Sequence, residues 1–215
     1  MTERKQRANG IASRAAILDA AAQIAGERGY EGTGIKAVSE RSGLPASSIY
    51  WHFKNKDELI AAVIERSFAA WVESLDQIRD IATSSDPLEA FVETFRASAR
   101  QLDRFPDFLR LGLMLMLEQR PNEPTARRRF QSVRAETLQR LDEAYRLAFP
   151  AASAAEAKGL AALTLAASDG LFVAAGAEEI DLVEGFEGLA RAVYGAALVN
   201  GWATQPTPGS AAARS

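Results

Sequence analysis

The sequence predicts an all-α protein of about nine helices. Apolar residues recur at three- and four-residue intervals along most of the 215 residues, which is the spacing of one face of a helix. No segment shows the alternation of apolar and polar residues that a half-buried strand requires. The composition, 47% apolar and 25% charged residues, is ordinary for a folded domain. We therefore expect packed helices without a sheet.

Three helices are expected in the first 53 residues, because glycines separate the apolar periods. The first has Ser13 as an early cap and ends at Gly29. The second follows Thr33, which can serve as its N-cap, and ends at Gly43. Pro45 opens the third, since proline is tolerated in a first helical turn.

Longer helices are expected to follow, separated by prolines and polar loops. Their predicted ranges are about 55–83, 87–102, 107–119, 125–148, 154–177 and 182–203. Residues 204–215 are rich in Pro, Gly, Ser and Ala, so we expect a disordered tail.

The composition excludes several kinds of chemistry. There is no Cys, which removes disulfides, thiolate catalysis and cysteine metal sites. One His leaves a zinc site or a histidine-based triad hard to build, so only carboxylate chemistry stays open. We expect no catalytic residues, metal or cofactor. The N-terminus, MTERKQRANG, is polar, and FLRLGLMLML is too short to span a bilayer, so we expect a cytoplasmic protein without a membrane partner.

The net charge of −3 is unevenly distributed. Residues 1–60 hold nine Lys or Arg against seven Asp or Glu, a balance of +2. The remaining residues hold sixteen against twenty-one, a balance of −5. This asymmetry is mild, but it has the sign of a DNA-contacting head on an acidic body.

Four consecutive ring side chains, YWHF at 50–53, end the third predicted helix. Phe53 shares a face with Ile49 four residues earlier, so both can pack inward. Tyr50, Trp51 and His52 then lie on other faces of a helix too short to be stable alone. Such an outer side suits a DNA major groove, as in a helix-turn-helix. The alternative is an aromatic corner packed on the next helix, beside solvated lysines.

The segment TGIKAVSERSGLPASSIYWHFKNKDELIAAVI resembles the N-terminal signature of the TetR family of bacterial one-component transcription regulators. The resemblance covers about residues 13–64. It consists of a Thr opening the second helix, a glycine turn, Tyr-x-His-Phe ending the third helix, and Asn-Lys-x-x-Leu opening the fourth. It implies a helix-turn-helix head on a helical body that binds a ligand and dimerises.

The resemblance also implies roles for individual residues. Those expected at base edges are Lys36, Ala46, Ser47 and Trp51. Those expected at phosphates are Thr33, Ser48, Tyr50, His52 and Lys56. Position 47 is often Gly in the family and position 46 often a longer polar residue, so direct readout here would rest on few base-edge donors.

The predicted domains follow from these roles. Residues 1–10 would be a flexible basic arm, 11–57 the helix-turn-helix domain, and 58–203 the ligand-binding and dimerisation domain. The arm, with Arg4, Lys5 and Arg7, either reaches DNA or stays solvated. Arg14 likewise either meets a phosphate or is solvated.

Large apolar side chains are concentrated in the body, where most are expected to be core. The resemblance adds an inducer cavity, for which Gly112 would leave space and methionines would be adaptable linings. The candidate ligand-binding residues are Phe68, Trp71, Phe91, Phe95, Phe108, Met114 and Phe172. Asp169, an acid in an apolar run, would read a ligand or lie at a dimer interface or helix surface.

The last two predicted helices are rich in Ala, Gly and Leu, which allows close helix packing between two subunits. We therefore predict a homodimeric repressor that binds double-stranded DNA at a palindromic operator. A small, largely apolar inducer would release it. The alternative is a helical ligand carrier or enzyme without DNA binding.

Overall fold

The computed structural model describes residues 2–72, 84, 86–117, 125–178 and 180–203, and the side chains from residue 7 onward within them. These residues form nine α-helices and no strand, which confirms the predicted all-α class. The helices are α1 (Thr2–Gly32), α2 (Ile35–Ser42), α3 (Ala46–His52), α4 (Lys56–Val72), α5 (Pro87–Arg104), α6 (Asp107–Leu117), α7 (Thr125–Ala148), α8 (Ala154–Ala177) and α9 (Leu182–Val199).

Several predicted boundaries agree with the structure. The predicted starts of α5, α7, α8 and α9 and the predicted ends of α7 and α8 are confirmed. The predicted continuation of α4 through residue 83 and the tail at 204–215 lie outside the described residues. The starts of α8 and α9 depend on local N-caps. Ser153 forms a reciprocal capping box with Glu156, and the Asp181 side chain accepts a hydrogen bond from the backbone N–H of Glu184.

α1 is bent at Gly29. This residue has φ 67° and ψ −172°, a backbone conformation open almost only to glycine. A Cβ at this position would also lie 2.6 Å from Cε of Met114. The predicted helix stop at Gly29 is therefore a kink, after which helical turns continue to Gly32.

The start of α1 differs from the sequence prediction. Residues 2–10, expected as a flexible arm, form the first turns of this helix. Ser13, expected as an early cap, lies inside the helix, and its hydroxyl donates to the Gly10 carbonyl at 3.0 Å. The apolar stripe that identifies a helix begins only near Ile17, so the sequence pattern gave no signal for the preceding turns.

The chain divides into two compact units. The first contains residues 1–69 and 105–133, and the second contains residues 70–104 and 134–215. The predicted boundary at residue 57 therefore differs from this division, because most of α4, all of α6 and the start of α7 belong with the first three helices. The helices α4 and α7 each contribute residues to both units.

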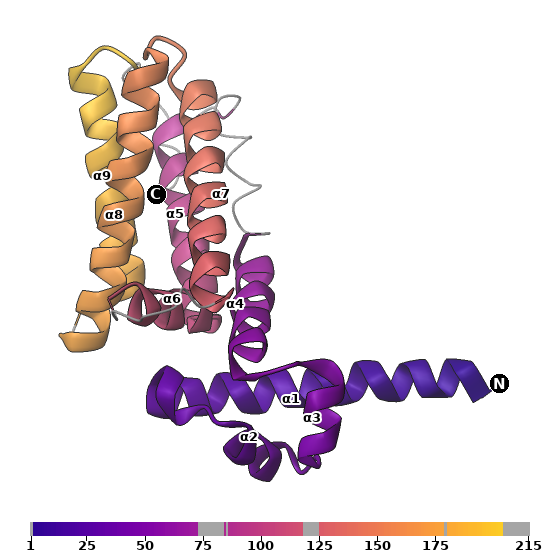
Figure 1. Ribbon diagram of the computed structural model, residues 1–215. Coiled ribbons are helices and arrows are strands. Elements are labelled where there is room, and N and C mark those ends of the chain that lie inside the picture. Colours follow the sequence, from indigo (N-terminus) through magenta and orange to yellow (C-terminus); the bar gives the residue numbers. More distant parts are fainter. Residues whose placement is uncertain (1, 73–83, 85, 118–124, 179, 204–215) are drawn as a thin grey trace, which may run out of the picture. The chain divides into compact units, whose positions relative to one another are not determined.

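In the first unit, α2 and α3 lie on the same side of α1 (Figure 1). The core between them contains Ile17, Ile24, Val38 and Ile49, all essentially inaccessible to solvent. On the surface, the two terminal guanidinium nitrogens of Arg41 donate to the carboxylate oxygens of Glu27 at 2.9 Å, which links α2 to α1. α6 also packs on α1.

The same unit contains a side-chain cap between two helices. Asp57, in the first turn of α4, accepts hydrogen bonds from the backbone N–H groups of Thr125 and Ala126, at 2.5 and 3.2 Å. These are the first residues of α7, whose N-terminal N–H groups have no partner within the helix. One carboxylate therefore holds the start of α4 to the start of α7.

In the second unit, α5, α8, α9 and the C-terminal part of α7 run alongside one another (Figure 1). Its core is an aromatic cluster in which neighbouring ring centroids lie about 6 Å apart or less. The members are Phe91, Phe95, Tyr145, Phe149 and Tyr194. Arg96 of α5 donates to Glu187 of α9 at 2.6 Å at the edge of this packing.

Candidate DNA-binding surface and ligand cavity

α3 is held in place by two side chains. Ile49 and Phe53 are buried, as their four-residue spacing predicted, and fix the helix against α1 and α2. This leaves Tyr50 57% exposed and Trp51 75% exposed. Because exposed aromatic side chains of this size are uncommon on a free protein surface, the outer side of α3 has the character of a contact surface.

The turn before α3 has the geometry of a helix-turn-helix. Gly43 caps α2 in the left-handed conformation, with φ 69°. The hydroxyl of Ser39 donates to the Leu44 carbonyl at 2.6 Å, which closes the turn. Pro45 follows in an extended conformation and leads directly into α3.

His52 links α3 to α1. Its Nε2 lies 2.9 Å from the hydroxyl oxygen of Ser13, and its ring meets the Trp51 ring edge-on with centroids 4.5 Å apart. Partial burial, followed by the nearby charge of Arg14, lowers the pKa of His52 below its usual 6.5. The histidine is thus neutral at pH 7 in the free protein.

Lys56 opens α4 beside the same surface. Its Nζ donates to the backbone carbonyl and carboxylate of Glu31, at 3.1 and 3.3 Å. The ammonium also lies 4.2 Å from the centre of the Tyr30 ring, a cation–π contact. These contacts hold one positive charge at a defined place near α3, which suits a phosphate.

The other predicted DNA-contacting residues, with one exception, are accessible. Lys36, Ala46, Ser47 and Tyr50 are exposed, and Ser48 is half-buried. Lys36 extends into solvent and approaches Glu40 at 4.0 Å. We call the accessible set Lys36, Ala46, Ser47, Ser48, Tyr50, Trp51, His52 and Lys56 the α3 surface. Arg14 lies over the Phe53 ring, 5.4 Å from its centre.

Thr33 is the exception, and its predicted phosphate contact is wrong. Thr33 is fully buried, and its hydroxyl donates to the Gly29 carbonyl at 2.8 Å. Its backbone N–H donates to the Tyr30 carbonyl at 3.1 Å. Both donors are therefore used inside the head, where they stabilise the chain after the α1 bend. The N-cap of α2 is Gly34.

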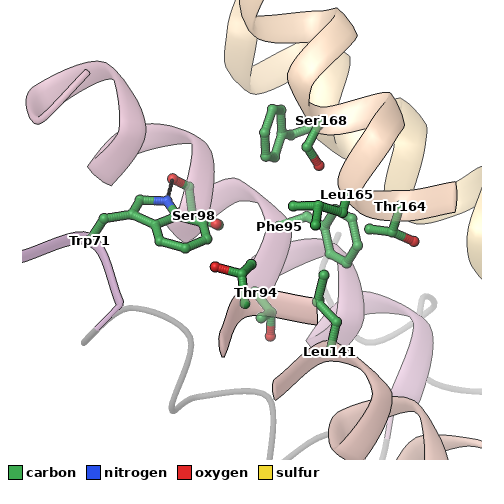
Figure 2. Close-up of a pocket in the computed structure, with 10 residues that line it drawn as sticks. Trp71, Thr94, Phe95, Ser98, Leu141, Thr164, Leu165 and Ser168 are labelled. Atoms are coloured by element: carbon green, nitrogen blue, oxygen red, sulfur yellow. Dashed lines mark hydrogen bonds between the residues drawn. The ribbon is translucent and has the colours of Figure 1, made fainter. Parts of the chain in front are cut away.

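A cavity of about 50 Å³ lies in the second unit and is lined by residues of α4, α5, α7, α8 and α9 (Figure 2). Its lining residues are Trp71, Thr94, Phe95, Ser98, Thr137, Leu141, Thr164, Leu165, Ser168 and Phe186. The indole N–H of Trp71 donates to the Ser98 carbonyl at 3.3 Å, which fixes the tryptophan in the wall. At about 10–15 Å³ per molecule, the cavity has space for roughly four waters.

Of the seven predicted ligand-binding residues, Trp71 and Phe95 line this cavity. Phe91 is in the aromatic core, and Phe172 is half-buried but absent from the lining.

The other three belong to the first unit, so they do not line this cavity. Phe68 packs against Phe108 with centroids 5.8 Å apart, and Met114 packs at Gly29. The space expected at Gly112 is taken by the ring of Phe130.

The hydroxyl-bearing residues of the lining were missed from the sequence. Thr94 and Ser98 are four apart and lie on the face of α5 that also carries Phe95. A hydroxyl residue repeated along an apolar stripe was therefore the signal that could have identified them. For Thr137, Leu141 and Ser168, the sequence contains no comparable pattern.

Asp169 has a cationic partner. Its carboxylate pairs with the guanidinium of Arg134, with N–O distances of 2.7 and 2.9 Å. This pairing satisfies the charge of an acid that lies in an apolar helix. Among the described residues, no group of three or more Asp, Glu or His side chains could hold a metal ion.

α8 leaves much of its apolar surface uncovered. Leu163 is 62% exposed and Val173 is 57% exposed, and a Cβ at Gly170 or Gly176 would meet no neighbouring atom. By length and composition, α8 is the one described helix that could cross a membrane, with a mean hydropathy of 1.6. The sequence prediction considered FLRLGLMLML, which is shorter than α8, and one helix of this kind is by itself weak evidence for a membrane span.

The first unit thus contains a helix-turn-helix head, with an exposed and rigidly held second helix. Residues 17–63 match the family described as "Bacterial regulatory proteins, tetR family". This match covers the head and agrees with the resemblance to the TetR signature that the sequence predicted.

Individual relatives extend the comparison. The HTH-type transcriptional repressor KstR2 of Mycolicibacterium smegmatis is 33% identical over 88 residues, covering 40% of this chain and 42% of the relative. SmeT, a repressor from Stenotrophomonas maltophilia, has a TM-score of 0.66 at 22% identity, covering 85% of this chain and 89% of SmeT. FadR from Bacillus subtilis, solved with stearoyl-CoA, has a TM-score of 0.63 at 18% identity, covering 83% and 96%. The family match lies in the head, whereas the structural likeness to SmeT and FadR covers 85% and 83% of this chain.

Proposed function

We propose that the protein is a homodimeric, sequence-specific transcriptional repressor that a small ligand releases from its operator. The observation that carries this proposal is the α3 surface. Buried Ile49 and Phe53 hold a helix whose aromatic and hydroxyl side chains face outward, inside the segment that matches the family. The proposed role is binding rather than catalysis, in the cytoplasm, where the DNA is.

In this proposal, base edges and phosphates are read by different residues. Lys36, Ser47 and Trp51 would contact base edges, with the Trp51 ring placed to meet thymine methyl groups. Tyr50, Ser48, His52 and Lys56 would contact phosphates. Ala46 offers no hydrogen bond, so we expect modest discrimination between bases at the pair it faces.

The exposed face of α8 supports dimerisation with a second copy of this chain. Leu163 and Val173 would be covered, and the small residues Gly170 and Gly176 would let the partner helix approach closely. The predicted interface uses α8 and α9. Two-fold symmetry would place two α3 helices in successive major grooves of a palindromic operator.

Dimerisation is tested by placing a charge on this face. Leu163→Asp should convert a dimer into a monomer in light scattering, because an unpaired carboxylate would be buried in the interface. Leu147→Asp on α7 is the matched control, since Leu147 is similarly exposed. A monomeric native protein, or a fully dimeric Leu163→Asp variant, would contradict the proposed interface.

Ligand control would act through α4. This helix supplies Lys56 to the α3 surface and Trp71 to the cavity wall. A ligand that displaces Trp71 would shift α4 and thereby the head. It must bind the DNA-incompetent state more tightly, typically by about 1–3 kcal/mol. The triclosan complex of SmeT and the stearoyl-CoA complex of FadR support a ligand-responsive body.

A salt titration tests the central proposal. The purified protein should bind random duplex DNA at low salt, with an affinity that falls steeply as salt rises. The DNA that flanks the gene should then be searched for an inverted repeat, and binding to that repeat compared with binding to random DNA. Absence of any DNA binding at low salt would refute the repressor and leave a ligand carrier as the better description.

A further inference from the structure

Among the residues that the structure describes, the cavity lining has no charged side chain. Its ten residues are apolar, aromatic or hydroxyl-bearing. The polar members are Thr94, Ser98, Thr137, Thr164 and Ser168, together with the indole of Trp71. Figure 2 shows side chains from several helices converging on this one space. A ligand with a net charge would therefore enter without an ionic partner, which is costly in a dry site.

A cation one helical turn from the lining is already paired. Arg134 lies one turn before Thr137 on α7, and its partner Asp169 follows Ser168 on α8. Their ion pair has N–O distances of 2.7 and 2.9 Å. An anionic ligand would have to break this pair and leave the Asp169 carboxylate unpaired. The geometry thus disfavours carboxylates and phosphates.

Several hydrogen-bond donors in the wall are committed to the protein. The Thr94 hydroxyl and the Thr164 hydroxyl each donate to the carbonyl one turn earlier in their own helix, both at 2.9 Å. The Tyr145 hydroxyl lies 2.8 Å from that of Thr164, and Trp71 donates to the Ser98 carbonyl. Hydroxyl oxygens keep acceptor lone pairs after donating. These groups therefore match a ligand that donates a hydrogen bond.

The size of the cavity limits the ligand further. At about 50 Å³, the cavity has about a third of the volume of a benzene-binding cavity of about 150 Å³. A long acyl chain would require the helices to separate. A single ring is the smaller demand: it would enter if the side chains of Leu141 and Leu165, which are apolar and can change rotamer, moved aside to enlarge the cavity.

We infer that the cavity takes a neutral, single-ring molecule with a hydroxyl group, of the phenol class. This inference rests on the proposed function, because it names the ligand of the proposed regulatory site. The ring would lie among Phe95, Leu141 and Phe186, and the hydroxyl would donate its proton to the Thr94 oxygen of α5. Anionic acids and acyl-CoA molecules would be excluded by the uncharged wall.

Trp71 provides a direct readout of binding. The chain has three Trp residues, so Trp51→Phe together with Trp202→Phe leaves Trp71 as the only fluorescent indole. Three probes of similar shape separate the effect of a donated hydrogen bond from the effect of a charge. They are para-cresol as a neutral donor, para-methylanisole as a neutral acceptor, and para-toluate as an anion. All are titrated at neutral pH, where the phenol is protonated and the acid is ionised.

Para-cresol should change the Trp71 emission saturably. It should bind roughly three- to tenfold more tightly than para-methylanisole, the effect of one hydrogen bond. It should bind at least about a hundredfold more tightly than para-toluate, whose charge would be unpaired. Equal affinities for para-cresol and para-toluate would overturn the assignment, and so would equal affinities for the two neutral probes or no binding of any probe.

Two leucines of α7 provide a matched pair of variants. Leu141→Phe fills the cavity and should abolish para-cresol binding, whereas Leu147→Phe changes an exposed position and should not. Retained binding in both would show that the ring binds elsewhere and overturn the inference. If Leu141→Phe does not fold, which its melting curve shows, the probe comparison still decides.

Failure of this inference can be distinguished from failure of the proposed function. Operator binding is measured separately with the unmodified protein. DNA binding without para-cresol binding would overturn only the ligand class. Para-cresol binding without DNA binding would support the cavity assignment and refute the repressor.

Discussion

Operator binding should strengthen as the pH falls, because His52 can hold a phosphate only when it is protonated. The Ser13 hydroxyl donates its single proton to the Gly10 carbonyl, so the hydrogen bond to His52 requires Nε2 to be the donor. In the neutral ring, Nδ1 is then a bare lone pair, which repels a phosphate. In the imidazolium form, Nδ1 carries a proton and can donate to it.

The sign and size of the effect follow from the pKa. Burial and the charge of Arg14 lower the pKa of His52 below 6.5 in the free protein, whereas a bound phosphate would raise it. The added affinity is complete below the pKa of the free protein and is lost as the pH rises through the pKa of the complex. For each unit by which the pKa in the complex exceeds the pKa in the free protein, the DNA affinity at low pH exceeds that at high pH by a factor of about ten per head, or about a hundred per dimer.

Fluorescence anisotropy with a labelled operator, from about pH 5 to 8, measures this linkage. His52→Gln keeps a polar side chain without a titrating charge, so it should remove most of the pH dependence. A DNA affinity that is flat with pH in the native protein would refute the protonated phosphate contact. An unchanged slope in His52→Gln would assign the pH dependence to another group.

Further predictions concern four single substitutions in the first unit. Lys56→Ala should weaken binding to all DNA sequences and lower the salt slope by about one per head, whereas Trp51→Ala should also change sequence preference in a selection experiment. Asp57→Ala should lower the free energy of unfolding by about 1 kcal/mol in urea titrations, because α7 loses its cap. Gly112→Ala should cost about 1–3 kcal/mol in the same assay, since its Cβ would overlap the Phe130 ring. An equal loss of affinity on every DNA sequence for Trp51→Ala would contradict its base-facing role. An unchanged free energy of unfolding in Asp57→Ala or Gly112→Ala would contradict the cap or the close packing assigned to that residue.

Local signals predicted the head well. The spacing of Ile49 and Phe53 identified the buried side of α3, and the glycine at position 43 identified the turn. These features depend on neighbours within a few residues, which the sequence displays directly. Thr33 was misassigned because its burial depends on the backbone path after Gly29, which no local pattern encodes.

The cavity was harder to predict, because it depends on which helix faces meet. Phe91 and Phe95 share a stripe on α5 and belong to the same aromatic cluster, yet only Phe95 also lines the cavity. Met114 lies in an apolar helix that suggested a lining, but that helix packs on α1. Periodicity shows that a side chain points inward, whereas its neighbours are determined by helix pairing over long sequence separations.

The bend at Gly29 has a consequence for genetics. Any other residue there would need a backbone conformation almost confined to glycine and would meet Met114. A screen for variants that no longer repress should therefore recover substitutions at Gly29 alongside those in the α3 surface. Loss of repression at Gly29 would report a disturbed fold of the head rather than a lost DNA contact. The positions of such variants should therefore not be read as the residues that touch DNA.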